Sequence, residues 1–76
     1  MERVTIYLRT ALFTLPGDAG HVPVGTTVLI GDVPDPAASN LSVTTFRFLD
    51  ERGRLLAEKS IQLLVPWSKI DHIQLG

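Results

Sequence analysis

The sequence predicts an all-β protein, a small five-stranded barrel that forms one domain over residues 1–76. Three observations predict this class. The segment RVTIYLR at 3–9 alternates apolar and polar residues with a period of two, as half-buried strands do. Four further apolar segments follow, separated by glycine-, proline- or aspartate-containing turns. The last turn separates its two segments so briefly that it indicates a barrel corner, and a barrel removes sheet edges by closing on itself.

The first strand is expected at residues 3–9. Its apolar face carries Val4, Ile6 and Leu8, and its polar face carries Arg3, Thr5, Tyr7 and Arg9. After Ala11 the apolar residues fall at Leu12, Phe13 and Leu15, so the phase slips. Because a shift of one residue exchanges the two faces of a strand, a bend, bulge or turn is expected there.

The second strand, TTVLIGDV at 26–33, lies between two irregular segments. PGDAGHVPVG at 16–25 is expected to be a loop, since it has three glycines and two prolines in ten residues. Within the strand, Gly31 either weakens the pairing or marks a close approach. PDPAASN at 34–40 is either one helical turn, with Asp35 as its N-cap, or a plain loop.

The third and fourth strands are predicted to form a hairpin. LSVTTFRFLD at 41–50 is strongly β in composition, and DERG at 50–53 has the Asp and Gly of a type I turn with a glycine bulge. RLLAEKSIQLLV at 54–65 is the return strand, although a helix across 51–64 is the rival. The strand is preferred because the turn joins it directly to residues 41–50. Its expected common face consists of Leu55, Ala57, Ile61, Leu63 and Val65, interrupted by Lys59.

The corner begins at Pro66, which cannot donate a ladder hydrogen bond, so the strand must bend or leave its neighbour there. PWSKI is about one short turn, and the spacing of Ile70 and Ile73 suits a 3₁₀ turn that runs into a strand. In SH3-like barrels such a corner takes the chain from one sheet to the other at nearly a right angle.

These segments resemble a known family. LLVPWSKIDHIQL at 63–75 looks like the end of Sm-like proteins, where the fourth strand, a short turn and the fifth strand follow in this order. RVTIYLRTALFTL at 3–15 is similar to the opening of their first conserved motif. The resemblance implies an SH3-like or Sm-like barrel whose fourth and fifth strands pair between subunits to form a ring. It also brings RNA binding as the alternative function.

Composition independently favours self-association. Hydrophobic residues make up 45% of the chain, and the mean hydropathy is +0.22. A domain of this size buries only about 60% of its unfolded surface and usually needs a supplement to its core. There is no cysteine, which excludes disulfides and fits a reducing cytoplasm. We therefore expect a homo-oligomer, either a ring or a dimer, and a protein partner is compatible with the same apolar surface.

Charge and termini bear on the remaining partners. The net charge is −1 and the pI is near 6.0, so no basic field attracts nucleic acid, and RNA binding stays open only as the alternative. No stretch reaches the roughly 18 apolar residues of a membrane span. MERVTIYL enters a strand without the pattern of a signal peptide. The expectation is a cytoplasmic protein without membrane contact.

The candidate binding residues fall into two groups. The expected interface lies in the last two strands and the turn between them: Leu63, Val65, Trp67, Ile70, Ile73 and Leu75. Trp67 should plug the open end of the barrel, form ring or partner contacts, since tryptophan is enriched at binding hot spots, or stack against a base. Arg3, Tyr7 and Arg9 share one strand face and are the candidate contacts for phosphate and base. The competing interpretation of these three is a solvated outer face.

No catalytic residue, cofactor or metal ion is predicted. Ser68, Asp71 and His72 suggest a catalytic triad, but adjacent strand residues point to opposite faces, so Asp71 should not support His72. His21 and Asp18 offer too few ligands for a stable metal site. The sequence thus predicts a non-catalytic, self-assembling Sm-like barrel that acts as a scaffold or partner-binding module.

Overall fold

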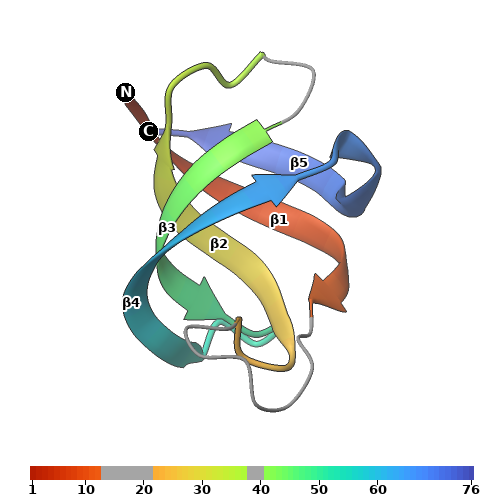
Figure 1. The fold of residues 1–76 in the computed structure, drawn as a ribbon. Helices are drawn as coiled ribbons and strands as arrows, with labels where there is room; N and C mark the ends of the chain where they lie inside the picture. The colour runs from red at the N-terminus through yellow and green to blue at the C-terminus, as the bar shows by residue number, and fades with distance from the viewer. Residues whose placement is uncertain (13–21, 38–40) are drawn as a thin grey trace.

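The computed structural model describes residues 1–12, 22–37 and 41–76, which form one antiparallel sheet (Figure 1). The strands are β1 (Glu2–Leu12), β2 (Thr26–Val33), β3 (Leu41–Leu49), β4 (Leu55–Val65) and β5 (Ile70–Leu75), with the 3₁₀ helix η1 (Trp67–Lys69) before β5. Their order across the sheet is β4-β3-β2-β1-β5. The predicted all-β class and the five strands are confirmed. No helix in this part of the chain is long and apolar enough to cross a membrane.

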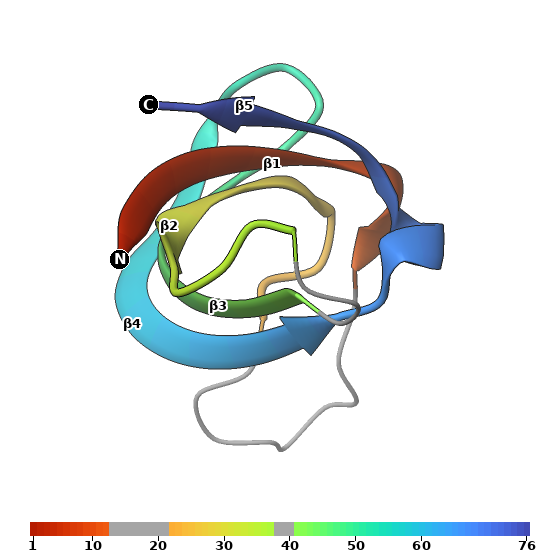
Figure 2. The same ribbon diagram turned by 90° about the horizontal axis from the view of Figure 1, so that it is seen from above.

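The sheet is open, and it curls strongly around its inner face (Figure 2). The strands β4 and β5 lie at its two edges and do not pair with each other within the described ranges. Most of the predicted loop at 16–25 lies within residues 13–21, which are outside the described ranges. This undescribed segment includes Phe13, Leu15, Asp18 and His21. Of the segment 34–40, the described residues form a turn in which the Ala37 N–H donates to the Asp35 carboxylate over 3.0 Å.

The inner face of the sheet forms the hydrophobic core. The predicted alternation in β1 is confirmed, because Val4, Ile6 and Leu8 are buried. They pack with buried residues of the other strands, chiefly Leu29, Val33, Leu41, Val43 and Phe48. Among the residues that the structure describes, Phe48 is the largest fully buried side chain. Burial of these side chains is the main stabilising contribution to the fold.

Register irregularities explain how so short a sheet curls. The pairing of β1 with β2 shifts between Tyr7 and Leu12, where the sequence predicts a bend or bulge. The pairing of β2 with β3 shifts at Gly31, and this glycine marks a close approach, since a Cβ there would overlap the carbonyl oxygen of Thr44. A bulge bends its strand and increases the local twist. Repeated irregularities therefore wrap the sheet around its inner side chains.

The turn between β3 and β4 is built around Asp50. Its carboxylate accepts the backbone N–H groups of Arg52 and Arg54, each at 2.9 Å, and its carbonyl accepts the Gly53 N–H at 3.0 Å. Gly53 has a φ of 79°, a conformation that favours glycine, as the predicted glycine bulge requires. The predicted hairpin is confirmed, and the rival helix is wrong.

The pKa of Asp50 lies below the ordinary 3.8, and the largest cause is the hydrogen bond that its carboxylate accepts from the Arg54 N–H. The hydrogen bond from the Arg52 N–H and the positive charges of the two arginines lower it further. The stability that the carboxylate contributes is complete above pH 3.8 and is lost as the pH falls through the lower folded-state pKa. We expect Asp50→Asn, which keeps the acceptor oxygen and loses the charge, to melt at a lower temperature than the wild type at pH 6. Melting curves recorded down to pH 2 should converge, whereas a constant difference would contradict this role for the charge.

One predicted feature of β4 is wrong. Leu55 does not share a face with Ala57, because the pairing shifts between Phe48↔Ala57 and Leu49↔Leu55. A second shift separates Ile61 from Glu58. The residues that face the core are therefore Ala57, Ile61, Leu63 and Val65. Leu55 is exposed, since the extra residue beside it reverses the alternation.

The predicted strand, tight turn and strand after Leu63 are confirmed. Pro66 ends β4 in an extended conformation, with φ −71° and ψ 146°, and its carbonyl accepts the Lys69 N–H over 3.0 Å. The chain then turns through η1 and enters β5 at Ile70. Since β5 pairs with β1, the corner carries the chain from one edge of the sheet to the other.

Candidate functional site

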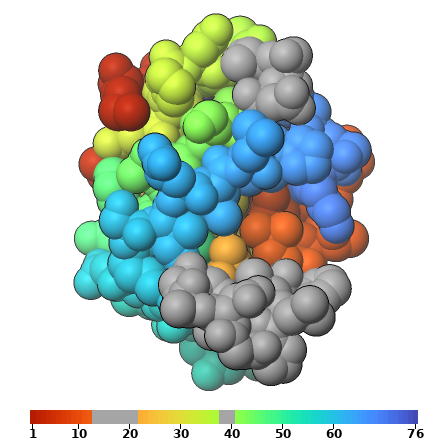
Figure 3. Space-filling model, in the orientation of Figure 1, coloured from red at the N-terminus to blue at the C-terminus, as the bar shows by residue number. Residues whose placement is uncertain are grey.

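The two edge strands are the most conspicuous surface of the described chain. An edge strand presents a row of backbone N–H and C=O groups that can pair with another strand. Here both edges also carry exposed apolar side chains, with Leu64 of β4 70% exposed and Leu75 of β5 58% exposed. In the space-filling view, β4 and η1 form one continuous surface across a face of the molecule (Figure 3). We define the edge site as β4 and β5 together with η1.

An apolar groove lies beside β5. It has a volume of about 310 Å³ and is lined by Pro36, Ala37, Trp67, Ile73 and Leu75. Trp67 is 39% exposed, so its indole is part of this surface and not of the buried core. The interpretation of Trp67 as a plug within the core is therefore wrong. Three of the six predicted interface residues meet in this groove.

The other predicted interface residues are deeper. Val65 and Ile70 are each 3% exposed and belong to the core of the same chain. Leu63 is partly buried and packs against that core. It also lines a second apolar pocket of about 240 Å³, with Leu12, Val22 and Leu64 among its other walls. The edge site thus continues directly into the core.

Sequence reasoning misses Leu64. Alternation selects its neighbours Leu63 and Val65, and Leu64 has the opposite phase, which places it on the solvent side of an edge strand. The doubled leucine is the signal for it, because consecutive apolar residues on a strand lie on both faces and one of them is then exposed.

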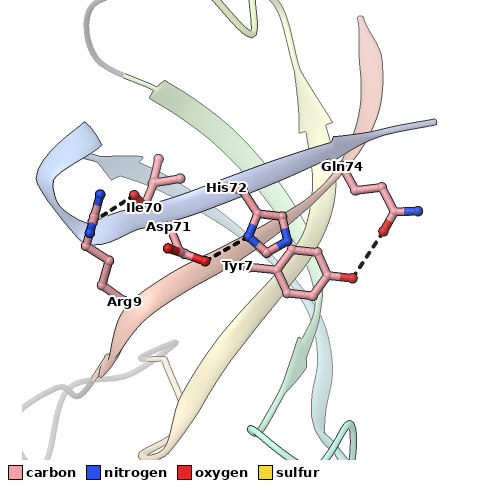
Figure 4. Close-up of polar contacts among 6 residues, drawn as sticks. All are labelled: Tyr7, Arg9, Ile70, Asp71, His72 and Gln74. Carbon is pink, nitrogen blue, oxygen red and sulfur yellow. Dashed lines mark hydrogen bonds and ion pairs between the residues drawn. The ribbon is translucent and has the colours of Figure 1, made fainter.

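The outer face of β1 and β5 carries a polar cluster (Figure 4). The rings of Tyr7 and His72 stack with centroids 4.3 Å apart and an interplanar angle of 11°. The Tyr7 hydroxyl donates to the Gln74 side-chain oxygen over 3.1 Å. Arg9 donates through Nε to the carbonyl of Ile70 over 3.1 Å. These contacts connect β5 to β1 both at the start of β5 and near its end.

The expectation that Asp71 would not support His72 is wrong. The Asp71 carboxylate lies 2.9 Å from Nδ1 of His72 (Figure 4). The reason is a bulge in β5: Tyr7 pairs with His72 and Leu8 pairs with Ile70, so Asp71 is the extra residue. A bulge interrupts the strict alternation of faces, and the two neighbouring side chains can meet. Both side chains are more than half exposed, so the pair is a surface contact.

The three candidate nucleic-acid contacts do not gather at one free site. Arg3 donates through Nε to the Asp32 carboxylate over 2.7 Å, and its guanidinium lies 4.8 Å from the centre of the Phe46 ring. Tyr7 and Arg9 are engaged by β5, as described above. The predicted common face of β1 is present, but each of its candidate side chains has a partner within the chain.

The described residues contain no group of three or more histidine, cysteine or acidic side chains that could hold a metal ion. The suggested pair of His21 and Asp18 lies outside them. No family model, curated protein or solved structure matches this chain.

Proposed function

We propose that the protein is a non-catalytic, self-assembling β module that acts as a scaffold or partner-binding unit. The observation that carries this proposal is the pair of sheet edges, β4 and β5: each has exposed apolar side chains, and each pairs with only one strand among the described residues. In water, bare apolar edges are prone to pair with other strands, and an assembly that pairs them protects the chain. An Sm-like ring is the arrangement that the sequence resemblance supports.

The edge site also supplies what a chain of this size needs. Seventy-six residues without cysteine have only a small core, and an interface can supplement it by burying further apolar area. The groove beside Trp67 and the exposed Leu64 provide that area. Aromatic side chains that are partly exposed beside a groove are typical anchors of protein interfaces.

RNA binding remains the alternative, and the polar partners of Arg3, Tyr7 and Arg9 do not favour it. One experiment addresses both functions. The purified protein is measured by light scattering after size exclusion, with absorbance read at 260 and 280 nm. We expect an oligomer without bound nucleic acid. A stable monomer at micromolar concentration contradicts self-assembly, and an oligomer with a high 260/280 ratio favours the alternative.

Ile73→Lys should dissociate the oligomer and lower the stability of the fold together. Ile73 packs partly against the core and also lines the groove, so a lysine there disturbs both. Loss of a partly buried isoleucine and the placement of a charge beside it should cost about 2 kcal/mol or more. The measurement is the molar mass by light scattering together with the urea midpoint. Glu51→Lys, in the exposed turn between β3 and β4 and outside the edge site, is the control, and equal dissociation by both variants would contradict the role of Ile73.

A further inference from the structure

We propose that the apolar pocket at the end of β4 binds a medium-chain alkyl carboxylate, with the alkyl chain inside the pocket and the carboxylate at the Lys69 ammonium. The pocket has a volume of about 240 Å³ and shares no described lining residue with the groove beside Trp67. Its described walls belong to a single copy of the chain, so binding requires no second copy. The ligand is a free amphiphilic anion.

The pocket lies where the curled sheet does not close. The pairing of β5 with β1 extends from Val4 to Leu8, and the rest of β1, up to Leu12, has no β5 partner among the described residues. At the opposite edge of the sheet, β4 ends at Val65 and the chain leaves it through Pro66. The 3₁₀ helix η1 then lies against β1, and both surfaces border each other in Figure 3. The pocket is the space between these segments.

The interior of the pocket is apolar. Its walls carry leucine, valine and proline side chains from both sides of the gap: Leu12, Val22, Leu63, Leu64, Val65 and Pro66. Val22 and Val65 belong to the hydrophobic core, and Leu63 packs against it, so the pocket reaches from the surface to the core. Water gains few hydrogen bonds in such surroundings, whereas an alkyl chain that enters them removes apolar surface from water.

The mouth of the pocket carries a positive charge. Lys69 is the one charged residue among the described residues that line it. The Lys69 ammonium donates to the Thr10 hydroxyl over 3.4 Å, and no carboxylate of the described residues lies within 4 Å of it. A ligand carboxylate at this place would accept a hydrogen bond from the ammonium with one oxygen and from the hydroxyl with the other.

Volume and charge together select the ligand. An apolar cavity of about 150 Å³ accommodates benzene, which has six carbon atoms. At the same volume per carbon atom, this pocket accommodates about eight to ten carbon atoms. Lys69 repels an alkylammonium headgroup and attracts a carboxylate. Octanoate is therefore the probe that fits both the interior and the mouth.

The other described cavities do not combine these two properties. The groove beside Trp67 is apolar but has no charged residue among its described walls. The cavities of about 530 and 450 Å³ on either side of the turn at Asp50 are lined by charged residues of both signs. An apolar interior with a single cationic residue at its mouth is a property of the pocket at the end of β4.

A chain-length series tests the apolar interior. Butyrate, hexanoate, octanoate and decanoate are titrated below their micelle-forming concentrations, and the leucine and valine methyl signals of the protein are followed by NMR. The affinity should rise about two- to fourfold for each added methylene up to about eight carbons and then level off. Octanoate should shift the signals of Leu12, Val22 and Leu64 and leave Leu55 and Leu75 unchanged. Equal affinities along the series, no shift at millimolar octanoate, or shifts confined to Leu75 would each overturn the proposed site.

A charge reversal tests the mouth. Lys69→Glu should weaken octanoate binding about five- to tenfold and should make octylamine the better ligand. The Lys69 side chain is exposed, so this variant should keep the fold. Lys59→Glu is the matched control, because it reverses an exposed lysine of β4 that does not line the pocket, and it should leave both affinities nearly unchanged. Equal losses for the two variants would overturn the assignment of the carboxylate to Lys69.

Discussion

Phe48→Ala should lower the free energy of unfolding by about 3–5 kcal/mol, the usual loss when a large core side chain is truncated. Phe48 is fully buried and lies among Leu29, Val43 and the inner residues of β1. Its removal deletes apolar contact and leaves a cavity that the surrounding strands cannot fill. Small domains are stable by only about 5 kcal/mol or slightly more. We therefore expect the variant to be largely unfolded at 37 °C.

Urea unfolding followed by circular dichroism measures the loss. Phe46→Ala is a matched control, since it removes the same side chain from the same strand. Phe46 is partly exposed on the outer face, where its ring contacts the guanidinium of Arg3. Loss of this contact should cost only about 0.5–1 kcal/mol. Similar losses for the two variants would show that Phe48 is not the centre of the core.

The contrast between these phenylalanines also shows where sequence reasoning fails. By alternation, residues 46 and 48 would share one face of β3. In the structure, the pairing with β2 shifts between Ile30↔Arg47 and Gly31↔Thr45, so Phe46 is the extra residue and faces outward. A bulge depends on the neighbouring strand, and a pattern read along one strand does not contain it.

The elements themselves are predictable because their signals are local. Pro66 and the Asp-to-Gly segment at 50–53 each favour a turn through the conformation of their own backbone. The structure has turns at both places. The alternation of β1 acts through burial of one face, and it too is present. Fold class therefore follows from the sequence, since these signals do not depend on distant residues.

The edge site is predictable only in part. The apolar composition of the last two strands predicts that the site lies there. Ile73 and Leu75, two of the predicted interface residues, line the groove. The burial of Val65 and Ile70 cannot be predicted from the sequence, because it depends on which residues pair with them. Val65 pairs with Leu41, and Ile70 pairs with Leu8. The contact of Asp71 with His72 escapes prediction for a related reason, the bulge against β1.

Gly31→Ala should be the most damaging change of a single methyl group in the described chain. A Cβ at this position would overlap the Thr44 carbonyl oxygen and would lie 2.9 Å from Cα of Thr45. Both atoms belong to the backbone of β3, so no side-chain rotation relieves the overlap, and two paired strands must separate. Forced overpacking of this kind costs about 1–3 kcal/mol and more where backbone must move. We expect a loss at the upper end of this range, measured by urea unfolding.

Gly53→Ala separates this steric effect from the backbone preference of glycine. Gly53 has a φ of 79°, and no atom lies within 4 Å of the position that a Cβ would occupy, so its alanine variant should lose only about 1 kcal/mol through conformational strain. If Gly31→Ala is no worse than Gly53→Ala, β2 and β3 do not approach as closely as the register shift at Gly31 implies. Under the proposed self-assembly, a Gly31→Ala chain that still folds should also assemble more weakly than Gly53→Ala, because moving β3 also moves β4, the edge strand that pairs with it.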